Sequence, residues 1–134
     1  MDKVLPGGIY KDLLLEGETE DVAFEVPANR VIELLYGEYK VSTAAPEGDR
    51  LLRCRVLAND YSKLLTLFEF TLAASLSKTI DFGISQIINT MVDDVIQLPS
   101  RFLLTAGMSL RFYIMNGQVG DSFSFSGKYV EWID

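Results

Sequence analysis

The fold is decided by residues 98–134, which read LPSRFLLTAGMSLRFYIMNGQVGDSFSFSGKYVEWID. In the middle of this stretch apolar and polar residues alternate, with Met108, Leu110, Phe112 and Ile114 set against Ser109, Arg111 and Tyr113. A period of two is typical of a strand that is buried on one face. The flanking residues 106–107 and 116–121 contain glycines, which suit tight turns. The stretch therefore predicts three β-strands.

Similar alternation upstream predicts strands at residues 22–26, 30–42, 50–57, 64–72 and 80–84. The leucine-rich stretch 64–72 could form a helix, but the spacing of its phenylalanines and its β-branched threonines favour a strand. Residues 85–98 predict a short helix or a loop, followed by a strand at residues 95–97. With turn signals between about eight or nine strands, the chain is predicted to be all-β, an antiparallel, jelly-roll-like β-sandwich.

Two of the predicted strands change the parity of their apolar residues at a glycine. In residues 30–42, the change at Gly37 separates Ile32, Leu34 and Tyr36 from Tyr39 and Val41. In the last strand, the change at Gly127 separates Phe123 and Phe125 from Val130 and Trp132. One extra residue at a glycine is typical of a β-bulge, so both strands are predicted to bend there.

The chain divides into an N-terminal arm, residues 1–20, and a β-sandwich domain, residues 21–134. The arm is the least regular part, because a Pro-Gly-Gly sequence breaks any early element and an acidic turn ends it. Its apolar side chains, which include Tyr10, Leu13 and Leu14, could contact a neighbouring subunit. They could also fold back onto their own sheet, as terminal apolar segments usually do, and we favour this interpretation.

The composition excludes most classes of enzyme. The 134 residues include no histidine, which removes the commonest general base, the usual transition-metal ligand and every Ser-His or Cys-His nucleophile pair. The single cysteine, Cys54, can form neither an intrachain disulfide nor a cysteine zinc cage. Its place in an alternating strand favours a small buried hydrophobe. We therefore expect a protein that is not an enzyme and has no cofactor or metal.

The net charge and the hydropathy of the chain argue against two classes of partner. A net charge of −7 opposes direct binding of nucleic acid, which needs a basic surface. No apolar run is long enough to span a membrane, and the opening MDKVLPGG does not resemble a secretion signal. We therefore expect neither nucleic acid nor a membrane as a partner, and synthesis in a reducing cytoplasm.

The acidic residues that could bind a metal are Asp81, Asp93, Asp94 and Asp121. Adjacent aspartates on a strand point to opposite faces, and no calcium-loop spacing surrounds these residues. We therefore interpret them as solvated turns.

The densest basic group is Arg50, Arg53 and Arg55. Because Arg53 and Arg55 share one strand face, they could bind a carboxylate or a phosphate on a partner. They could also form salt bridges within the chain or with another subunit, which we favour. Aromatic residues such as Tyr113 suggest a carbohydrate platform, but a core or interface position is the favoured interpretation.

Taken together, these features resemble a group of small structural proteins of tailed bacteriophages. The shared pattern consists of an early long strand, an Arg-led strand, and a closing series of Leu-Pro, apolar strand, Gly, strand, Gly-Asp, strand and Glu-Trp. It is matched here by Arg50 opening RLLRCRVL, by Leu98-Pro99, by Gly107 before MSLRFYI, by Gly120-Asp121 and by Glu131-Trp132. The likeness covers residues 22–134 and contains no catalytic motif.

The resemblance implies a β-sandwich that is a capsid decoration (cement) protein or another virion accessory protein. We therefore expect a non-enzymatic protein of the capsid surface, made in the host cytoplasm, that stabilises the head by bridging major capsid protein or other virion subunits. We also expect a homo-oligomer, with a trimer favoured. The alternatives are a phage tail or head-completion adaptor and a carbohydrate- or receptor-binding module. The expected interface residues are Tyr10, Leu13, Leu14, Arg53, Arg55 and Tyr113.

Overall fold

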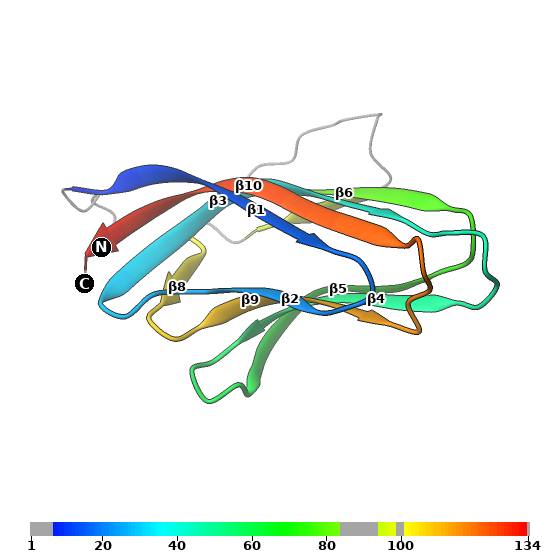
Figure 1. Cartoon of the computed structure of the whole chain (residues 1–134). Coiled ribbons are helices and arrows are strands. Elements are labelled where there is room, and N and C mark those ends of the chain that lie inside the picture. Colours follow the sequence, from blue (N-terminus) through cyan, green and yellow to red (C-terminus); the bar gives the residue numbers. More distant parts are fainter. Residues whose placement is uncertain (1–6, 84–93, 99–100, 134) are drawn as a thin grey trace.

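The computed structural model describes residues 7–83, 94–98 and 101–133, which form two β-sheets packed face to face (Figure 1). The larger sheet consists of β1 (Ile9–Gly17), β3 (Arg30–Ser42), β6 (Ser77–Gly83), β7 (Asp94–Gln97), β8 (Leu103–Thr105) and β10 (Ser122–Ile133). The smaller sheet consists of β2 (Val22–Glu25), β4 (Arg50–Leu57), β5 (Lys63–Leu72) and β9 (Ser109–Met115). The described residues contain no helix. The all-β sandwich is confirmed, whereas its jelly-roll character stays a prediction.

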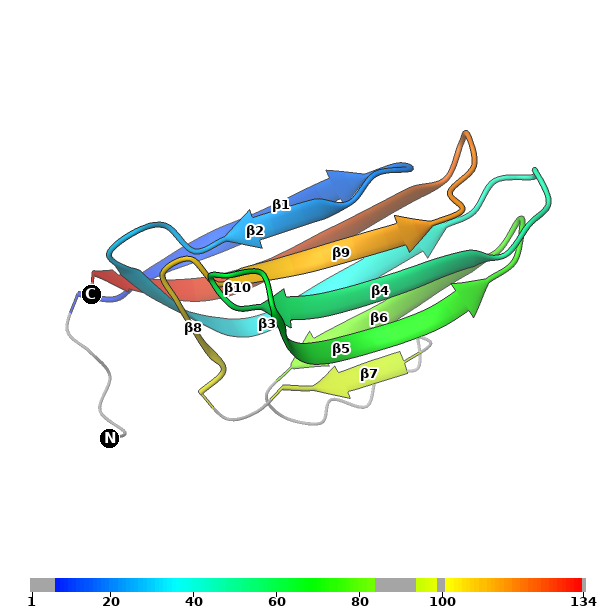
Figure 2. The ribbon, with the colours of Figure 1, turned by 90° about the horizontal axis from the view of Figure 1, so that it is seen from below.

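The strand order brings distant segments side by side. The large sheet runs β1-β10-β3-β6-β7, with β8 pairing the first part of β3, and the small sheet runs β2-β9-β4-β5 (Figure 2). The described strand pairs are antiparallel except β6 and β7, which are parallel. The first strand therefore pairs with the last, so both ends of the chain contribute to one sheet.

Aromatic side chains fill the space between the sheets. Tyr39 of β3 stacks on Phe112 of β9, with ring centroids 5.5 Å apart and an interplanar angle of 7°. Phe125 of β10 lies 4.9 Å from the same phenylalanine ring. Leu110 and Ile114 point into this core beside Phe112, so the alternation predicted for this strand is confirmed. Contacts of this kind join the two sheets into one core.

The predicted N-terminal arm is largely a strand of the sandwich. β1 pairs with β10 from Ile9, opposite Glu131, to Gly17, opposite Phe123. This pairing confirms the interpretation that the arm folds back onto its own sheet. Alternation along β1 turns Leu13 into the core and its neighbour Leu14 outward to solvent.

The long strand β3 contains one bulge, which lies two residues before the glycine indicated by the sequence. Lys128 of β10 lies opposite Tyr36 and Tyr129 lies opposite Leu34, so Leu35 is the extra residue. The bulge turns Tyr36 to the outer face of the sheet, where its side chain is 48% exposed. The expected place of Tyr36 on the face of Leu34 is therefore wrong.

The second predicted bulge, at Gly127, is also wrong. The register between β1 and β10 runs unbroken through Gly127, which lies opposite Leu13. Tyr129 therefore stays on the core face, and Val130 and Trp132 occupy the outer face. The prediction failed because Val130 and Trp132 are apolar although they face away from the core.

Two ambiguous segments are now assigned in part. The leucine-rich stretch forms β5, so its interpretation as a strand is confirmed. The strand expected before Pro99 is confirmed as β7. Most of the short helix or loop expected from Ser85, together with Asp93, lies outside the described residues.

Candidate interaction surfaces

The outer face of the small sheet carries three arginines and a tyrosine. Arg53 and Arg55 project from β4, and Arg111 and Tyr113 project from β9, because the other parity of both strands faces the core. Arg53 lies opposite Tyr113 and Arg55 lies opposite Arg111. We call these four residues the arginine face, and the sheet that carries it is turned toward the viewer in Figure 2.

The arginine face is cationic and incompletely neutralised. Within the described residues, only Arg53 of its three arginines has an acidic partner, Glu69, with 2.6 Å between Nε and Oε1. The guanidinium carbons of Arg53 and Arg55 both lie 5.9 Å from the centre of the Tyr113 ring, a cation–π distance. The Nε atoms of Arg55 and Arg111 are buried and have no hydrogen-bond partner. This positive surface belongs to a chain with a net charge of −7.

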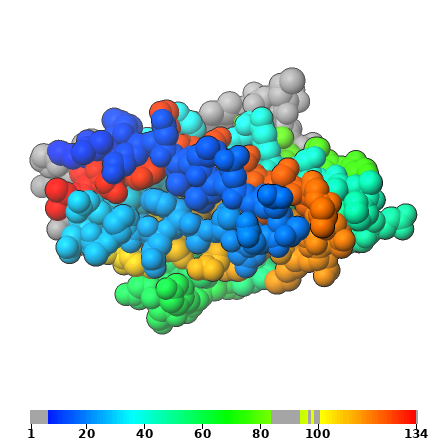
Figure 3. All heavy atoms as spheres, in the orientation of Figure 1, coloured from blue at the N-terminus to red at the C-terminus, as the bar shows by residue number. Residues whose placement is uncertain are grey.

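A second surface lies on the opposite side of the sandwich, along the outer face of β1. Tyr10 and Leu14 project from it and are 72% and 63% exposed. β1 ends the described sheet and pairs only with β10 there, and Figure 3 shows β1 (dark blue) at the surface. Exposed apolar side chains on an edge strand are typical of a contact with another chain. We call Tyr10 and Leu14 the β1 face.

A hollow of about 280 Å³ adjoins Tyr10 on this side of the molecule. An ion pair between Arg101 and Glu33, with 3.6 Å between Nε and Oε1, borders it. The apolar part of the hollow is lined by Tyr10, Leu35, Val130 and Trp132. Val130 and Trp132, the outward apolar residues of β10, can therefore contribute to binding, because an apolar side chain of a partner can insert beside them.

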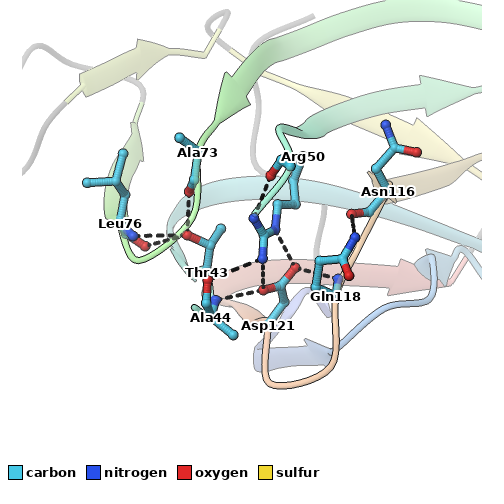
Figure 4. Close-up of polar contacts among 9 residues, drawn as sticks. Thr43, Ala44, Arg50, Ala73, Leu76, Asn116, Gln118 and Asp121 are labelled. Carbon is cyan, nitrogen blue, oxygen red and sulfur yellow. Dashed lines mark hydrogen bonds and ion pairs between the residues drawn. The ribbon is translucent and has the colours of Figure 1, made fainter. Parts of the chain in front are cut away.

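Arg50 and Asp121 form a buried ion pair where the β3–β4 and β9–β10 loops meet (Figure 4). Both side chains are 0% exposed, and Arg50 Nε and Nη2 donate to the carboxylate oxygens of Asp121 at 2.9 and 3.1 Å. Asp121 also accepts the backbone N–H groups of Ala44 at 2.7 Å and Gln118 at 2.8 Å. Arg50 donates further to the carbonyl oxygen of Gly48. The pair therefore ties the two loops together.

This geometry corrects the interpretation of Asp121 as part of a solvated turn. Burial opposes the charged form of the carboxyl group, but hydrogen bonds from Arg50, Ala44 and Gln118 outweigh that effect. Together they hold the pKa of Asp121 below its usual 3.8. The internal salt bridges favoured for the arginines are confirmed for Arg50 and for Arg53.

Cys54 lies in the core between the sheets and is 0% exposed. Burial raises the pKa of its thiol well above the usual 9.0, so the side chain is neutral and unreactive in the folded chain. The interpretation of Cys54 as a small buried hydrophobe is confirmed. In the part of the chain that is described, no three acidic or cysteine side chains are placed to hold a metal ion. Nor does that part contain a helix long and apolar enough to cross a membrane.

The aromatic residues do not form one continuous platform. Tyr39 and Trp132 are buried, at 1% and 4% exposure. Tyr36 instead lines a separate groove of about 320 Å³ on the outer face of the large sheet, with Glu38, Asp81 and Ser126 among its other lining residues. An exposed ring beside polar side chains is the type of surface on which a sugar stacks.

The structure divides the six predicted interface residues among three places. Arg53, Arg55 and Tyr113 meet on the arginine face, while Tyr10 and Leu14 share the β1 face across the sandwich. Leu13 does not belong to an accessible interface, because it is 7% exposed and packs in the chain's own core.

Arg111 is the residue of the arginine face that sequence reasoning missed. Its alternation with Leu110 and Phe112 placed it on the same strand face as Tyr113. Arg111 lies opposite Arg55 because β9 pairs with β4. This pairing joins distant parts of the chain, so the alternation of residues along one strand cannot predict it. A search for paired outward arginines on neighbouring strands would have needed the strand order.

Comparisons of the chain with protein-family models, with curated proteins and with solved structures find no match. The function is therefore argued from the geometry of the two surfaces described above.

Proposed function

We propose that this chain is a non-enzymatic phage virion protein, a capsid decoration (cement) protein that stabilises the head by bridging subunits. The observation that carries the proposal is the position of the β1 face and the arginine face on opposite outer faces of one sandwich. A protein that cements a shell has to contact at least two neighbours at once and needs no catalytic group. The resemblance to small phage structural proteins supports the same function.

The scaffold between the two faces is suited to holding them at a fixed separation. The stacked rings of Tyr39 and Phe112 join the sheets, and the Arg50–Asp121 pair fixes loops at one end. The strand orders β1-β10-β3-β6 and β2-β9-β4-β5 support a jelly roll, a two-sheet architecture found in viral capsid proteins.

In this proposal the β1 face docks on the head. Tyrosine is enriched among the residues that dominate binding energy at protein interfaces, and the hollow beside Tyr10 receives an apolar side chain of the shell protein. Because the chain binds only the assembled shell, its binding stabilises the shell by mass action.

The test uses heads of the encoding virus that lack this protein, incubated with purified chain and separated from it by sedimentation. The variant Tyr10→Ser with Leu14→Ser should reduce retention on heads by about tenfold or more, as loss of a hot-spot aromatic does. A matched control is Tyr61→Ser with Leu76→Ser, which removes the same two residue types, at 61% and 49% exposure, from loops elsewhere on the surface. Equal retention of both variants, or no retention of the wild-type chain, would refute the proposal.

A second candidate function, a carbohydrate- or receptor-binding module, is favoured by the groove beside Tyr36. It predicts that the wild-type chain binds glycans on an array and that Tyr36→Ala abolishes this binding. Tyr61→Ala, in a turn, is the control. An array without hits would dismiss this candidate. The third candidate, a tail or head-completion adaptor, predicts rings at a tail or portal position in micrographs of labelled virions.

A further inference from the structure

The arginine face lacks negative partners that its own chain could supply. Arg55 and Arg111 lie directly opposite each other on neighbouring strands, where like charges repel and destabilise the pair. Within the described residues neither forms an ion pair, and the Nε atom of each is buried without an acceptor. Two half-buried guanidinium groups that face each other are stabilised by an anion between them, and within the described residues the chain supplies none, so an acceptor from another chain is indicated.

The arginine face is also organised for binding. Tyr113 lies beside both arginines of β4, and Glu69 holds Arg53 from the other side. The guanidinium groups of Arg53 and Arg55 are thus restrained before a ligand arrives, which reduces the entropy lost on binding. Guanidinium groups bind carboxylates through two parallel hydrogen bonds, so a carboxylate is a matching ligand.

A matching set of carboxylates is present on the chain itself, at the end of β1 and in the turn that leads to β2. Residues 16–21 read EGETED, and the side chains of Glu16, Glu18, Glu20 and Asp21 are all exposed. Figure 3 shows this turn at the surface, where dark blue β1 passes into lighter blue β2. No ion pair neutralises these four residues within the described structure. We call residues 16–21 the acidic turn.

The acidic turn ends beside the edge of the arginine face, but within the described residues no ion pair joins it to Arg55 or Arg111. The acidic turn links the two sheets at one end of the sandwich, while the arginine face lies along the middle of β4 and β9. Asp21, at the end of the turn, already accepts the backbone N–H of Ile114 at 3.3 Å. We propose that the arginine face binds the acidic turn of a second copy of this chain, with Arg55 and Arg111 receiving the carboxylates of Glu18 and Glu20.

Such a contact joins two different surfaces, so it is heterologous. Each copy then offers one arginine face and one acidic turn, and copies add head to tail until the rotation between them closes a ring. The inference does not rest on the capsid role, because the arginine face and the β1 face lie on opposite sides of the sandwich.

The first measurement is the mass of the purified full chain by light scattering during dilution. The wild-type chain should form an oligomer that dissociates at about 1 M salt, where the Debye length is ~3 Å and exposed charges are screened. Glu18→Lys with Glu20→Lys should weaken association by about a hundredfold, since close interfacial charge pairs couple strongly. Glu47→Lys with Asp49→Lys makes the same change in net charge in another exposed loop, and it should leave the oligomer intact.

The decisive experiment mixes two variants that are each expected to be monomeric. One carries Arg55→Gln with Arg111→Gln and keeps its acidic turn; the other carries Glu18→Lys with Glu20→Lys and keeps its arginine face, and a glutamine face offers no charge to the lysine turn. The mixture should form a heterodimer that grows no further, because one intact turn meets one intact face. Circular dichroism confirms that both variants are folded, and if the arginine variant is not, Arg111→Gln replaces it.

A wild-type chain that stays monomeric at high concentration would overturn the inference, as would a mixture without heterodimers. An oligomer that survives the lysine variant of the turn would overturn it as well. Retention on heads reports separately on the β1 face, since the monomeric turn variant keeps Tyr10 and Leu14. Failure of self-association therefore does not imply failure of the proposed function, and the converse also holds.

Discussion

Removing the Asp121 carboxylate should be among the most damaging single changes in this chain. Asp121→Ala leaves the Arg50 guanidinium, 0% exposed, without its counter-ion, and it also orphans the N–H groups of Ala44 and Gln118. Breaking a buried pair by removing one partner costs about 3–5 kcal/mol, and each orphaned N–H adds about 1–3 kcal/mol. The free energy of unfolding should thus fall by at least about 5 kcal/mol, a large part of a typical domain's total.

Arg50→Met should cost less, because the carboxylate left behind keeps its two backbone N–H donors and can take up a proton. An arginine left behind cannot lose its charge. The double variant Arg50→Met with Asp121→Ala should therefore be more stable than Asp121→Ala alone, by about 2 kcal/mol or more.

The assay is urea unfolding at neutral pH, read by tryptophan fluorescence and extrapolated to water. Asp12→Ala, which breaks the surface pair with Lys128, is the control and should cost no more than about 1 kcal/mol. Costs that simply add in the double variant, or an Asp121→Ala cost as small as that of the control, would refute this account of the loop junction.

The Asp121 carboxylate should also make the free energy of unfolding fall at acidic pH. Because its pKa is below 3.8 in the folded chain, the stabilisation is present above the unfolded pKa and is lost as pH falls through the folded value. The stability difference between wild type and Asp121→Ala should therefore narrow below about pH 4. A constant difference down to acid unfolding would contradict the assignment.

Three further predictions test other parts of the sandwich. Leu13→Ala should cost about 2–4 kcal/mol and its neighbour Leu14→Ala within about 0.5 kcal/mol, so equal costs in urea unfolding would contradict the placement of β1. The Cys54 thiol should react with Ellman's reagent only when urea unfolds the chain, and rapid labelling without urea would contradict its burial. Gly37→Ala should cost about 1–3 kcal/mol, because an added Cβ would overlap the Phe125 ring, which is 1% exposed and enclosed; an unchanged melting temperature would argue against this packing.

Strand faces were predictable because they depend on local alternation. Leu110 and Phe112 point into the core, and Cys54 is buried, as the period of two indicated. The same rule failed where an apolar residue faces outward. Tyr36 and Trp132 have largely apolar side chains but lie on the outer face of the large sheet. The alternation of apolar and polar residues cannot distinguish an apolar outer surface from a core.

Pairings between distant residues were beyond reach of the sequence pattern. Arg50 and Asp121 both belong to the pattern that the chain shares with small phage structural proteins. That pattern does not predict that they pair, because 71 positions separate them. Only the strand order places the β3–β4 and β9–β10 loops at the same end of the sandwich, where the two side chains meet. The sequence therefore indicates only a solvated turn at Asp121, because no metal-binding spacing surrounds it and its partner Arg50 is distant in the chain.

The contrast between two groups of arginines shows which part of the chain is arranged for partners. Arg50 is fully buried and donates to Asp121 and to loop carbonyl oxygens. Arg55 and Arg111 are half-buried and leave donors unmatched, although the chain has 19 acidic residues against 12 basic ones. A shortage of carboxylates therefore does not explain the difference. Four exposed carboxylates lie in the acidic turn, and within the described residues none of them pairs with Arg55 or Arg111, which is why we propose that the two complementary surfaces meet between copies.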